Sequence, residues 1–161
     1  MPTIRLANAD DIDRMAEIEA LCFPAAEAAP LESFKKRFAV FAECFYVLEV
    51  DGRIVGHING CINVTPTLPD ALYSNPHLHR PQGSYQTVFG LAVDPAFQKR
   101  GFASMLLKHF AQVSRDKGLK GMVLTCKSHL VALYEKHHYV QQGVSASTHG
   151  GAQWLDMLHE F

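Results

Sequence analysis

The stretch with the clearest chemical potential is a short turn between an apolar strand and a helix. It follows the apolar residues Leu91, Ala92 and Val93. Gly101 and Ala103 have small side chains that would let a bulky anion approach the backbone closely. Unpaired N–H groups and the dipole at a helix start both favour a bound phosphate. The turn is therefore a candidate diphosphate cradle, and an ordinary strand-to-helix turn is the alternative.

Two elements must hold this cradle in place. Residues 84–93 have the composition of a strand. An amphipathic helix is expected after Gly101, because apolar and aromatic residues recur there at helical spacing: Phe102, Met105, Leu106, His109, Phe110 and Val113. Gly118 occupies a helix C-cap position. Lys99 and Arg100 would add positive charge at the rim of the cradle.

The other elements predict one sheet flanked by helices. Strands 45–50 and 53–64 are joined by Asp51-Gly52, which is typical of an antiparallel hairpin. Residues 65–83 contain four prolines and predict a long surface loop. Further helices are expected over 12–22, 31–40 and 130–137, and further strands over 3–7, 122–125, 139–142 and 153–158. This mixed order indicates an α/β or α+β fold.

Composition favours a single globular domain over residues 1–161. The 161 residues are 48% hydrophobic and 19% charged, with a net charge of −1 at pH 7, so a packed core is expected and nucleic-acid binding is not. No apolar run is long enough for a membrane span, and the N-terminus lacks a signal-peptide pattern. We expect a cytoplasmic monomer or homodimer.

The cysteine and histidine patterns favour a protein without a metal. No C-x-x-C pair is present, which favours reduced, buried thiols at all four cysteines: Cys22, Cys44, Cys61 and Cys126. The pair His77 and His79 invites a zinc interpretation. No recognised spacing supplies the remaining ligands of a tetrahedral site, so we expect no metal.

The turn and its surroundings resemble the GNAT (GCN5-related) superfamily of N-acetyltransferases. Residues 98–103, Gln-Lys-Arg-Gly-Phe-Ala, are similar to the family's Q/R-x-x-G-x-G/A acetyl-CoA loop. Residues 133–139 resemble its later tyrosine-containing helix and closing strand, and residues 19–24 and 52–60 resemble its N-terminal helix and hairpin. The resemblance covers nearly the whole chain. It implies one central, mixed, mostly antiparallel sheet flanked by about four helices.

Within the superfamily, the chain is most similar to the arylalkylamine (serotonin) N-acetyltransferases and their bacterial relatives. Residues 78–83, 90–93 and 124–127 carry this finer similarity. Vertebrate members have an H-x-H pair on the third strand, where this chain has Thr87 and Phe89. If those enzymes relay the amine proton through that pair, this chain must use another base or a chain of waters.

The resemblance also implies roles for individual residues. Acetyl-CoA would be the co-substrate, held by the strand end and the turn: Leu91, Ala92, Val93, Gln98, Lys99, Arg100, Gly101, Phe102, Ala103 and Ser104. Tyr134 matches the family's tyrosine position and would donate a proton to the departing CoA sulfur. The alternative for Tyr134 is a core aromatic residue at helical spacing.

Two residues are candidates for the base that takes the amine proton. Glu27 matches an acidic position in insect arylalkylamine acetyltransferases and could also bind a substrate ammonium; a solvated loop glutamate is the alternative. His57 lies on the polar face of a predicted strand, and an imidazole ordinarily titrates near about pH 6.5. A hydrogen-bonded core histidine is its alternative. Four aromatic residues are candidates for the amine pocket or for the core: Phe23, Phe34, Phe38 and Tyr73.

The activity implied by the resemblance is transfer of acetyl from acetyl-CoA to a small primary amine. The amine, arylalkylamine or polyamine-like, would attack directly in a ternary complex. A protein or peptide N-terminal acetyltransferase is one alternative, and an acyl-CoA sensor without turnover is another.

Overall fold

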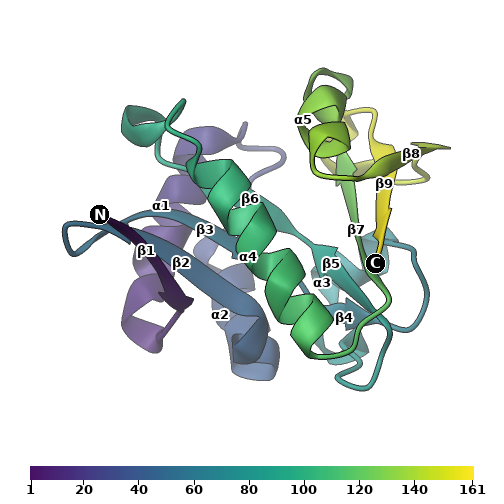
Figure 1. Cartoon of the computed structure of the whole chain (residues 1–161), viewed down its shortest axis with the longest axis horizontal. Coiled ribbons are helices and arrows are strands. Elements are labelled where there is room, and N and C mark those ends of the chain that lie inside the picture. Colours follow the sequence, from purple (N-terminus) through teal and green to yellow (C-terminus); the bar gives the residue numbers. More distant parts are fainter.

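The computed structural model describes all 161 residues as a mixed α/β fold of nine strands and five α-helices (Figure 1). The strands are β1 (Pro2–Leu6), β2 (Phe45–Val50), β3 (Arg53–Asn59), β4 (Ile62–Asn63), β5 (Tyr85–Val88), β6 (Gly90–Val93), β7 (Gly121–Cys126), β8 (Val140–Val144) and β9 (Leu155–Glu160). The helices are α1 (Ile12–Cys22), α2 (Leu31–Phe41), α3 (Asp70–Ser74), α4 (Phe102–Asp116) and α5 (Val131–Lys136). The predicted mixed class is confirmed, with one helix more than the four expected.

The strands form two sheets where one continuous sheet was predicted. The first has the order β1-β2-β3-β6 and is antiparallel, whereas the second has the order β4-β5-β7-β9-β8 and contains one parallel pair, β5 with β7. The predicted strand 84–93 is interrupted at Phe89, and its two halves belong to different sheets. The two sheets therefore diverge from this strand, and Figure 1 shows β7 and β9 splayed away from β3 and β6.

Helices cover both faces of the first sheet. In Figure 1, α4 lies across the front of the sheet and α1 and α2 lie behind it. Each helix buries the apolar residues that its spacing predicts, such as Met15 in α1, Phe34 in α2 and Phe110 in α4. Two charged residues share these buried faces, Glu19 in α1 and Arg37 in α2. Burial of a charge is costly, so both residues mark places where function can outweigh stability.

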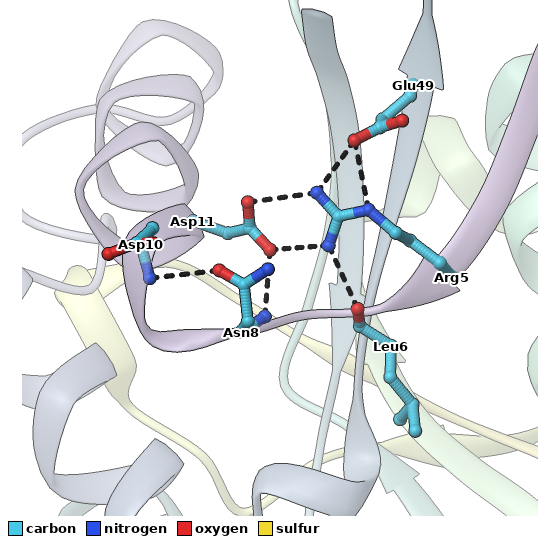
Figure 2. A network of polar contacts seen from close by, with 6 residues as sticks. All are labelled: Arg5, Leu6, Asn8, Asp10, Asp11 and Glu49. Atoms are coloured by element: carbon cyan, nitrogen blue, oxygen red, sulfur yellow. Dashed lines mark hydrogen bonds and ion pairs between the residues drawn. The ribbon is translucent and has the colours of Figure 1, made fainter. Parts of the chain in front are cut away.

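A polar network fixes the start of α1 to the first sheet (Figure 2). The Arg5 guanidinium on β1 donates to both carboxylate oxygens of Asp11, at 2.7 and 3.0 Å, and to Glu49 on β2 at 2.7 Å. Burial alone would raise the pKa of Asp11, but hydrogen bonds from Arg5 and from the Asn8 amide lower it overall. The carboxylate is thus held ionised, and α1 is anchored at its first turn.

A second ion pair ties the first turn of α1 to the end of β6. Arg14 donates to Asp94 at 2.6 Å and to the carbonyl oxygen of Ile54 at 3.0 Å. Asp94 also accepts a hydrogen bond from the Ala96 amide at 2.9 Å, immediately before the candidate cradle. These two anchors hold the first turn of α1 against the first sheet and the end of the strand that leads into the cradle.

The segment 65–83 is more ordered than a surface loop. It contains the short helix α3 and a single helical turn at Pro76–Leu78. Asp70, at the start of α3, accepts hydrogen bonds from Ser147 Oγ at 2.5 Å and from the Thr148 amide at 3.2 Å. The segment is therefore attached to the loop between β8 and β9, and it closes one side of the region between the two sheets.

Three of the four cysteines are buried, and of the pair His77 and His79 only His79 is buried. All four cysteines are free thiols; Cys44, Cys61 and Cys126 are buried, and Cys22 is half-buried. His79 accepts a hydrogen bond from the Ile62 amide at Nδ1, and its Nε2 lies 3.1 Å from Glu43. Both of its ring nitrogens therefore have protein partners. No helix combines the length and the apolar composition needed to cross a membrane.

Candidate active site

A cavity of about 670 Å³ follows the strand end and the turn singled out in the sequence. Nine of the ten residues predicted to hold acetyl-CoA line it: Leu91, Ala92, Val93, Gln98, Lys99, Gly101, Phe102, Ala103 and Ser104. Arg100 does not line the cavity, and its guanidinium lies over the ring of Phe97 at 5.1 Å from the ring centroid. The sequence thus located one continuous groove.

The local backbone opens this groove toward the start of α4. Lys99 and Gly101 both have positive φ, 64° and 81°, and a Cβ atom at Gly101 would meet nothing within 4 Å. No side chain caps α4, and its first turn contains no acidic residue. The first amides of a 15-residue helix are thus available beside open space, which is the arrangement that binds a diphosphate.

A second cavity of about 470 Å³ lies between the sheets and is covered by α1, α2 and α3. It is lined on one side by Phe89 and Gly90, at the start of β6, and on the other by Leu124 and Thr125 of β7. It meets the first cavity at a junction, defined here as the residues that line both: Phe23, Glu27, Leu91, Leu130, Tyr134 and Trp154. Two molecules bound in the two cavities would therefore meet beside Tyr134.

Tyr134 lies at this junction, on α5, and is only 7% exposed. Its ring packs edge-on against Tyr139, with ring centroids 5.6 Å apart. Burial raises the pKa of the Tyr134 hydroxyl well above its ordinary value, with smaller effects from Cys126 and Tyr73. The hydroxyl is therefore protonated at neutral pH. The two interpretations from the sequence are compatible, because the ring packs in the core while the residue lines both cavities.

Glu27 also lies at the junction, in an ion pair that the sequence did not reveal. Its Oε2 lies 2.8 Å from Nζ of Lys127, just beyond the end of β7. The Lys127 ammonium lies 5.8 Å from the centroid of the Trp154 ring. His149 Nε2 contacts the Glu27 carbonyl oxygen at 2.8 Å. The Glu27 side chain is therefore fixed by its ion pair with Lys127, and Glu27 lines both cavities.

His57 lies outside both cavities, although it was a candidate base. It is completely buried on β3, and burial lowers its pKa to about 3, so its ring is neutral. Phe34 packs edge-on against the ring at 5.5 Å. His57 Nε2 has no hydrogen-bond partner and points toward Glu19 Oε1 at 3.6 Å. His57 is therefore connected to the second cavity only through Glu19, which lines that cavity.

Glu19 is a titratable residue of the second cavity that was not among the candidates predicted from the sequence. It lines the second cavity, its Oε2 accepts from the Ala29 amide at 3.0 Å, and its buried Oε1 has no partner. Burial raises the pKa of Glu19 to about 7, despite the Ala29 hydrogen bond and the positive charge of Arg37. The signal was present in the sequence, because Glu19 follows Met15 by four residues on the apolar face of α1.

Gly90 makes room for the Glu19 carboxyl group. A Cβ atom at position 90 would lie 3.2 Å from Glu19 Oε1 and 3.5 Å from Cε1 of His57. The first residue of β6 is therefore small where a carboxyl group approaches it. The Glu19 carboxyl group, whose pKa is about 7, therefore lies next to the start of β6, where the two sheets separate.

The four candidate pocket aromatics divide between cavity and core. Phe23 and Tyr73 line the second cavity. Phe34 is buried against His57, and Phe38 packs edge-on against Phe45 with centroids 5.4 Å apart. At the two positions matching the H-x-H pair, the buried Thr87 hydroxyl donates to the Cys61 carbonyl oxygen at 2.9 Å, and Phe89 stacks on Tyr73. Thr87 lines neither cavity, and the Phe89 ring carries no group that exchanges a proton.

Comparison with known proteins identifies the class. Residues 12–139 match the model of the acetyltransferase (GNAT) family, and the chain belongs to that family. The resemblance to this superfamily noted in the sequence is thereby confirmed.

Two curated relatives are similar to this chain at low identity. The serotonin N-acetyltransferase of Mesocricetus auratus is 29% identical over 108 residues, which are 66% of this chain and 51% of that protein. The uncharacterized N-acetyltransferase YkwB of Bacillus subtilis (strain 168) is 24% identical over 132 residues, 75% of this chain and 58% of that protein. The chain thus spans little more than half the length of these relatives.

Among solved structures, the GphF GNAT-like decarboxylase in complex with isobutyryl-CoA is similar over the whole fold. The TM-score is 0.82 at 23% identity, and the match covers 98% of each chain. Likeness at this identity establishes a shared fold and leaves the reaction open.

The raised pKa of Glu19 predicts a stability that depends on pH. Because the folded protein keeps this proton more tightly than the unfolded chain, its stability is full below about pH 4.5 and declines as the pH rises toward 7. Glu19→Gln should remove that decline. We expect the variant to gain stability relative to the parent protein by up to about 3 kcal/mol at pH 8, with little difference at pH 4.

Urea unfolding at both pH values measures this effect. Glu17→Gln, on the exposed side of the same helix, is the matched control and should show no such trend. Equal stability differences at pH 4 and pH 8 for Glu19→Gln would show that the carboxyl group titrates normally.

Proposed function

We propose that this protein is an acetyl-CoA-dependent N-acetyltransferase that acts on a small primary amine. The observation that carries the proposal is the junction of two cavities at Tyr134 in a chain of the acetyltransferase (GNAT) family. One cavity leads to the uncapped start of α4 and suits acetyl-CoA. The other is smaller and contains carboxyl groups, which suits an amine.

In this proposal acetyl-CoA occupies the larger cavity. The amides at the start of α4 hold its diphosphate, and Lys99 supplies further positive charge at the cavity wall. The pantetheine arm lies along β6, whose far edge is released from β7 where the sheets diverge. An extended amide-containing arm can pair with such an edge in the manner of an added strand. The thioester then reaches the junction.

The chemistry requires two proton transfers. The amine nitrogen attacks the thioester carbonyl carbon, and the carbon–sulfur bond then breaks. Tyr134 donates its hydroxyl proton to the departing sulfur. We assign the amine proton to Glu19, because Glu19 lines the second cavity, its Oε1 has no hydrogen-bond partner, and its pKa of about 7 suits a base at neutral pH.

Glu27 and His57 take supporting roles in this assignment. Glu27 lies at the junction and supplies negative charge for the incoming ammonium, while its own position is held by Lys127. His57 lies behind Glu19 and positions the carboxyl group from inside the first sheet. Aromatic side chains in the cavity wall, among them Phe23 and Trp154, support an arylalkylamine as the acceptor.

The proposed diphosphate site can be tested at Gly101. Gly101→Glu places a negative charge beside the first amides of α4, so the affinity for CoA should fall at least about tenfold. Isothermal titration calorimetry with CoA measures the dissociation constant. Gly118→Glu is a matched control, because Gly118 also has positive φ, 79°, and open space around its Cβ position, but lies beyond the other end of α4.

The control separates backbone strain from charge repulsion. Gly118→Glu should bind CoA as the parent protein does. If both variants lose affinity equally, or if Gly101→Glu binds CoA normally while folded, the diphosphate does not lie at the start of α4.

The proposed proton donor is tested with Tyr134→Phe. The hydroxyl acts only when the sulfur leaves, so kcat should fall about a hundredfold or more while the dissociation constant of acetyl-CoA stays nearly unchanged. Release of free thiol in the presence of a panel of amines measures kcat. Tyr139→Phe is the control, because Tyr139 is buried beside Tyr134 but lines neither cavity. An unaltered kcat in Tyr134→Phe would remove this residue from the chemistry.

The roles of the two carboxyl groups and of His57 are separated by pH–rate profiles. A base must be deprotonated to act, so the rate should rise through about pH 7, the pKa of Glu19. Glu19→Gln should abolish this acidic limb and lower kcat about a hundredfold. Glu27→Gln should raise KM for a cationic amine and keep the limb.

His57→Gln should shift the limb without abolishing it, because the substitution changes only the surroundings of Glu19. If Glu27→Gln removes the limb and Glu19→Gln keeps it, the base is Glu27. If only His57→Gln removes the limb, the polar face of β3 supplies the base. Thiol release from peptides in place of small amines would make the protein a peptide acetyltransferase.

A further inference from the structure

Arg37 is a buried cation in the second cavity, which is the proposed amine site, and it takes no part in the two proton transfers. It lies on the inner face of α2, is 6% exposed and lines the second cavity but not the first. Its Nη2 donates to the carbonyl oxygen of Tyr73 at 3.0 Å, and its guanidinium lies 4.8 Å from the centroid of the Phe89 ring. The buried Nε has no hydrogen-bond partner.

No carboxylate of the protein forms an ion pair with this guanidinium. Its hydrogen-bond partners are limited to one backbone carbonyl group. Burial lowers the pKa of Arg37, although Glu19 acts in the opposite direction, but a guanidinium remains charged throughout the physiological range. A buried arginine normally has a paired anion, because an uncompensated buried charge is strongly destabilising. Glu19 acts on this guanidinium only through its charge, so the hydrogen-bond donors of Arg37 remain for an anion from outside the protein chain.

The shape of the guanidinium indicates which anion fits. A planar fork of N–H donors matches the two oxygens of a carboxylate, and a lysine could not reproduce that geometry. The ring of Phe89 supports the guanidinium from one side, which fixes its plane. Arg37 lines the wall of an open cavity, so a ligand there can approach its guanidinium, and the buried Nε is left without a partner inside the protein.

We infer that Arg37 binds a carboxylate group of the substrate, and that the acceptor is an amino acid or a similar amine carrying a carboxylate. The inference rests on the proposed function and narrows its acceptor. The groups follow one another along the strand from the junction inward: Leu91 lines both cavities, Glu19 approaches Gly90, and Arg37 covers Phe89. A zwitterion bound by Arg37 would therefore present its amine to Glu19, next to the thioester.

This arrangement disfavours the polyamines considered from the sequence. A polyamine would bring further positive charge beside a guanidinium that has no ion-pair partner, and like charges repel. An arylalkyl side chain remains compatible, since Phe23, Tyr73 and Trp154 line the same cavity. An acyl group that ends in a carboxylate, such as malonyl, is the other possible source of the anion, and the test below distinguishes the two.

The test measures binding and turnover with paired ligands. The proteinogenic amino acids are each compared with the corresponding decarboxylated amine, by calorimetric titration into the protein saturated with CoA and by thiol release with acetyl-CoA. At least one amino acid should bind tenfold or more tightly than its amine, a difference of about 1.4 kcal/mol. In Arg37→Met this preference should disappear through a higher KM for the amino acid. The comparison is made above the acidic limb, because loss of the Arg37 charge raises the pKa of Glu19.

Two further variants make the result specific. Arg37→Lys keeps the charge but loses the fork, so it should retain only part of the preference. Lys36→Met removes a cation from the exposed side of α2 and should keep all of it. Thermal unfolding checks that each variant is folded, and if Arg37→Met is not, the comparison of Arg37→Lys with Lys36→Met decides.

The second arm titrates malonyl-CoA and acetyl-CoA into the parent protein and into Arg37→Met. A preference for malonyl-CoA that depends on Arg37 would keep the carboxylate site and move its ligand to the acyl group. The inference is overturned if neither amino acids nor malonyl-CoA lose affinity in the Arg37 variants. Failure of the proposed function gives a different result, which is acetyl-CoA binding without thiol release for any amine, and the binding arms still decide the role of Arg37.

Discussion

The change of hydrogen-bonding partner along residues 85–93 is the constraint on which the rest of the structure depends. The first half of this strand pairs with β7 and the second half with β3, so the two sheets separate at Phe89. Strand β7 continues to Cys126 and pairs with β9 alone over its last two residues. The open region between the sheets holds both cavities, and the turn at Gly101 extends directly from the released half of the strand.

Helices α1 and α2 place charged side chains in the cavity between the sheets. Glu19 and Arg37 are buried on faces otherwise given to the core, and each has an unpartnered polar atom. Such groups cost stability, so the fold must hold them firmly. The anchors from Arg5 and Arg14 to neighbouring carboxylates fix α1 at its first turn. Arg37 acts on the pKa of Glu19 through its charge, so the two residues form one electrostatic unit.

Local features of this protein could be predicted from its sequence, whereas features made by distant segments could not. The cradle, the hairpin turn at Asp51-Gly52 and the apolar faces of the helices depend on residues close together in the chain. The separation of the sheets at Phe89 depends on pairing with strands on either side, and nothing in residues 84–93 reveals it. For the same reason the polar face of β3 was misleading: His57 is sealed behind Glu19 by Phe34. Glu19 and Arg37 interrupt apolar helical faces, and that pattern was the available clue.

A crystal structure of the protein with CoA and an N-acetylated product tests the central claim most directly, since it locates both ligands relative to the junction. The account predicts that the diphosphate lies against the first amides of α4, that the CoA sulfur lies within hydrogen-bond distance of the Tyr134 hydroxyl, and that the product nitrogen lies on the Glu19 side. A CoA sulfur remote from Tyr134, or a product bound outside the cavity between the two sheets, would contradict it.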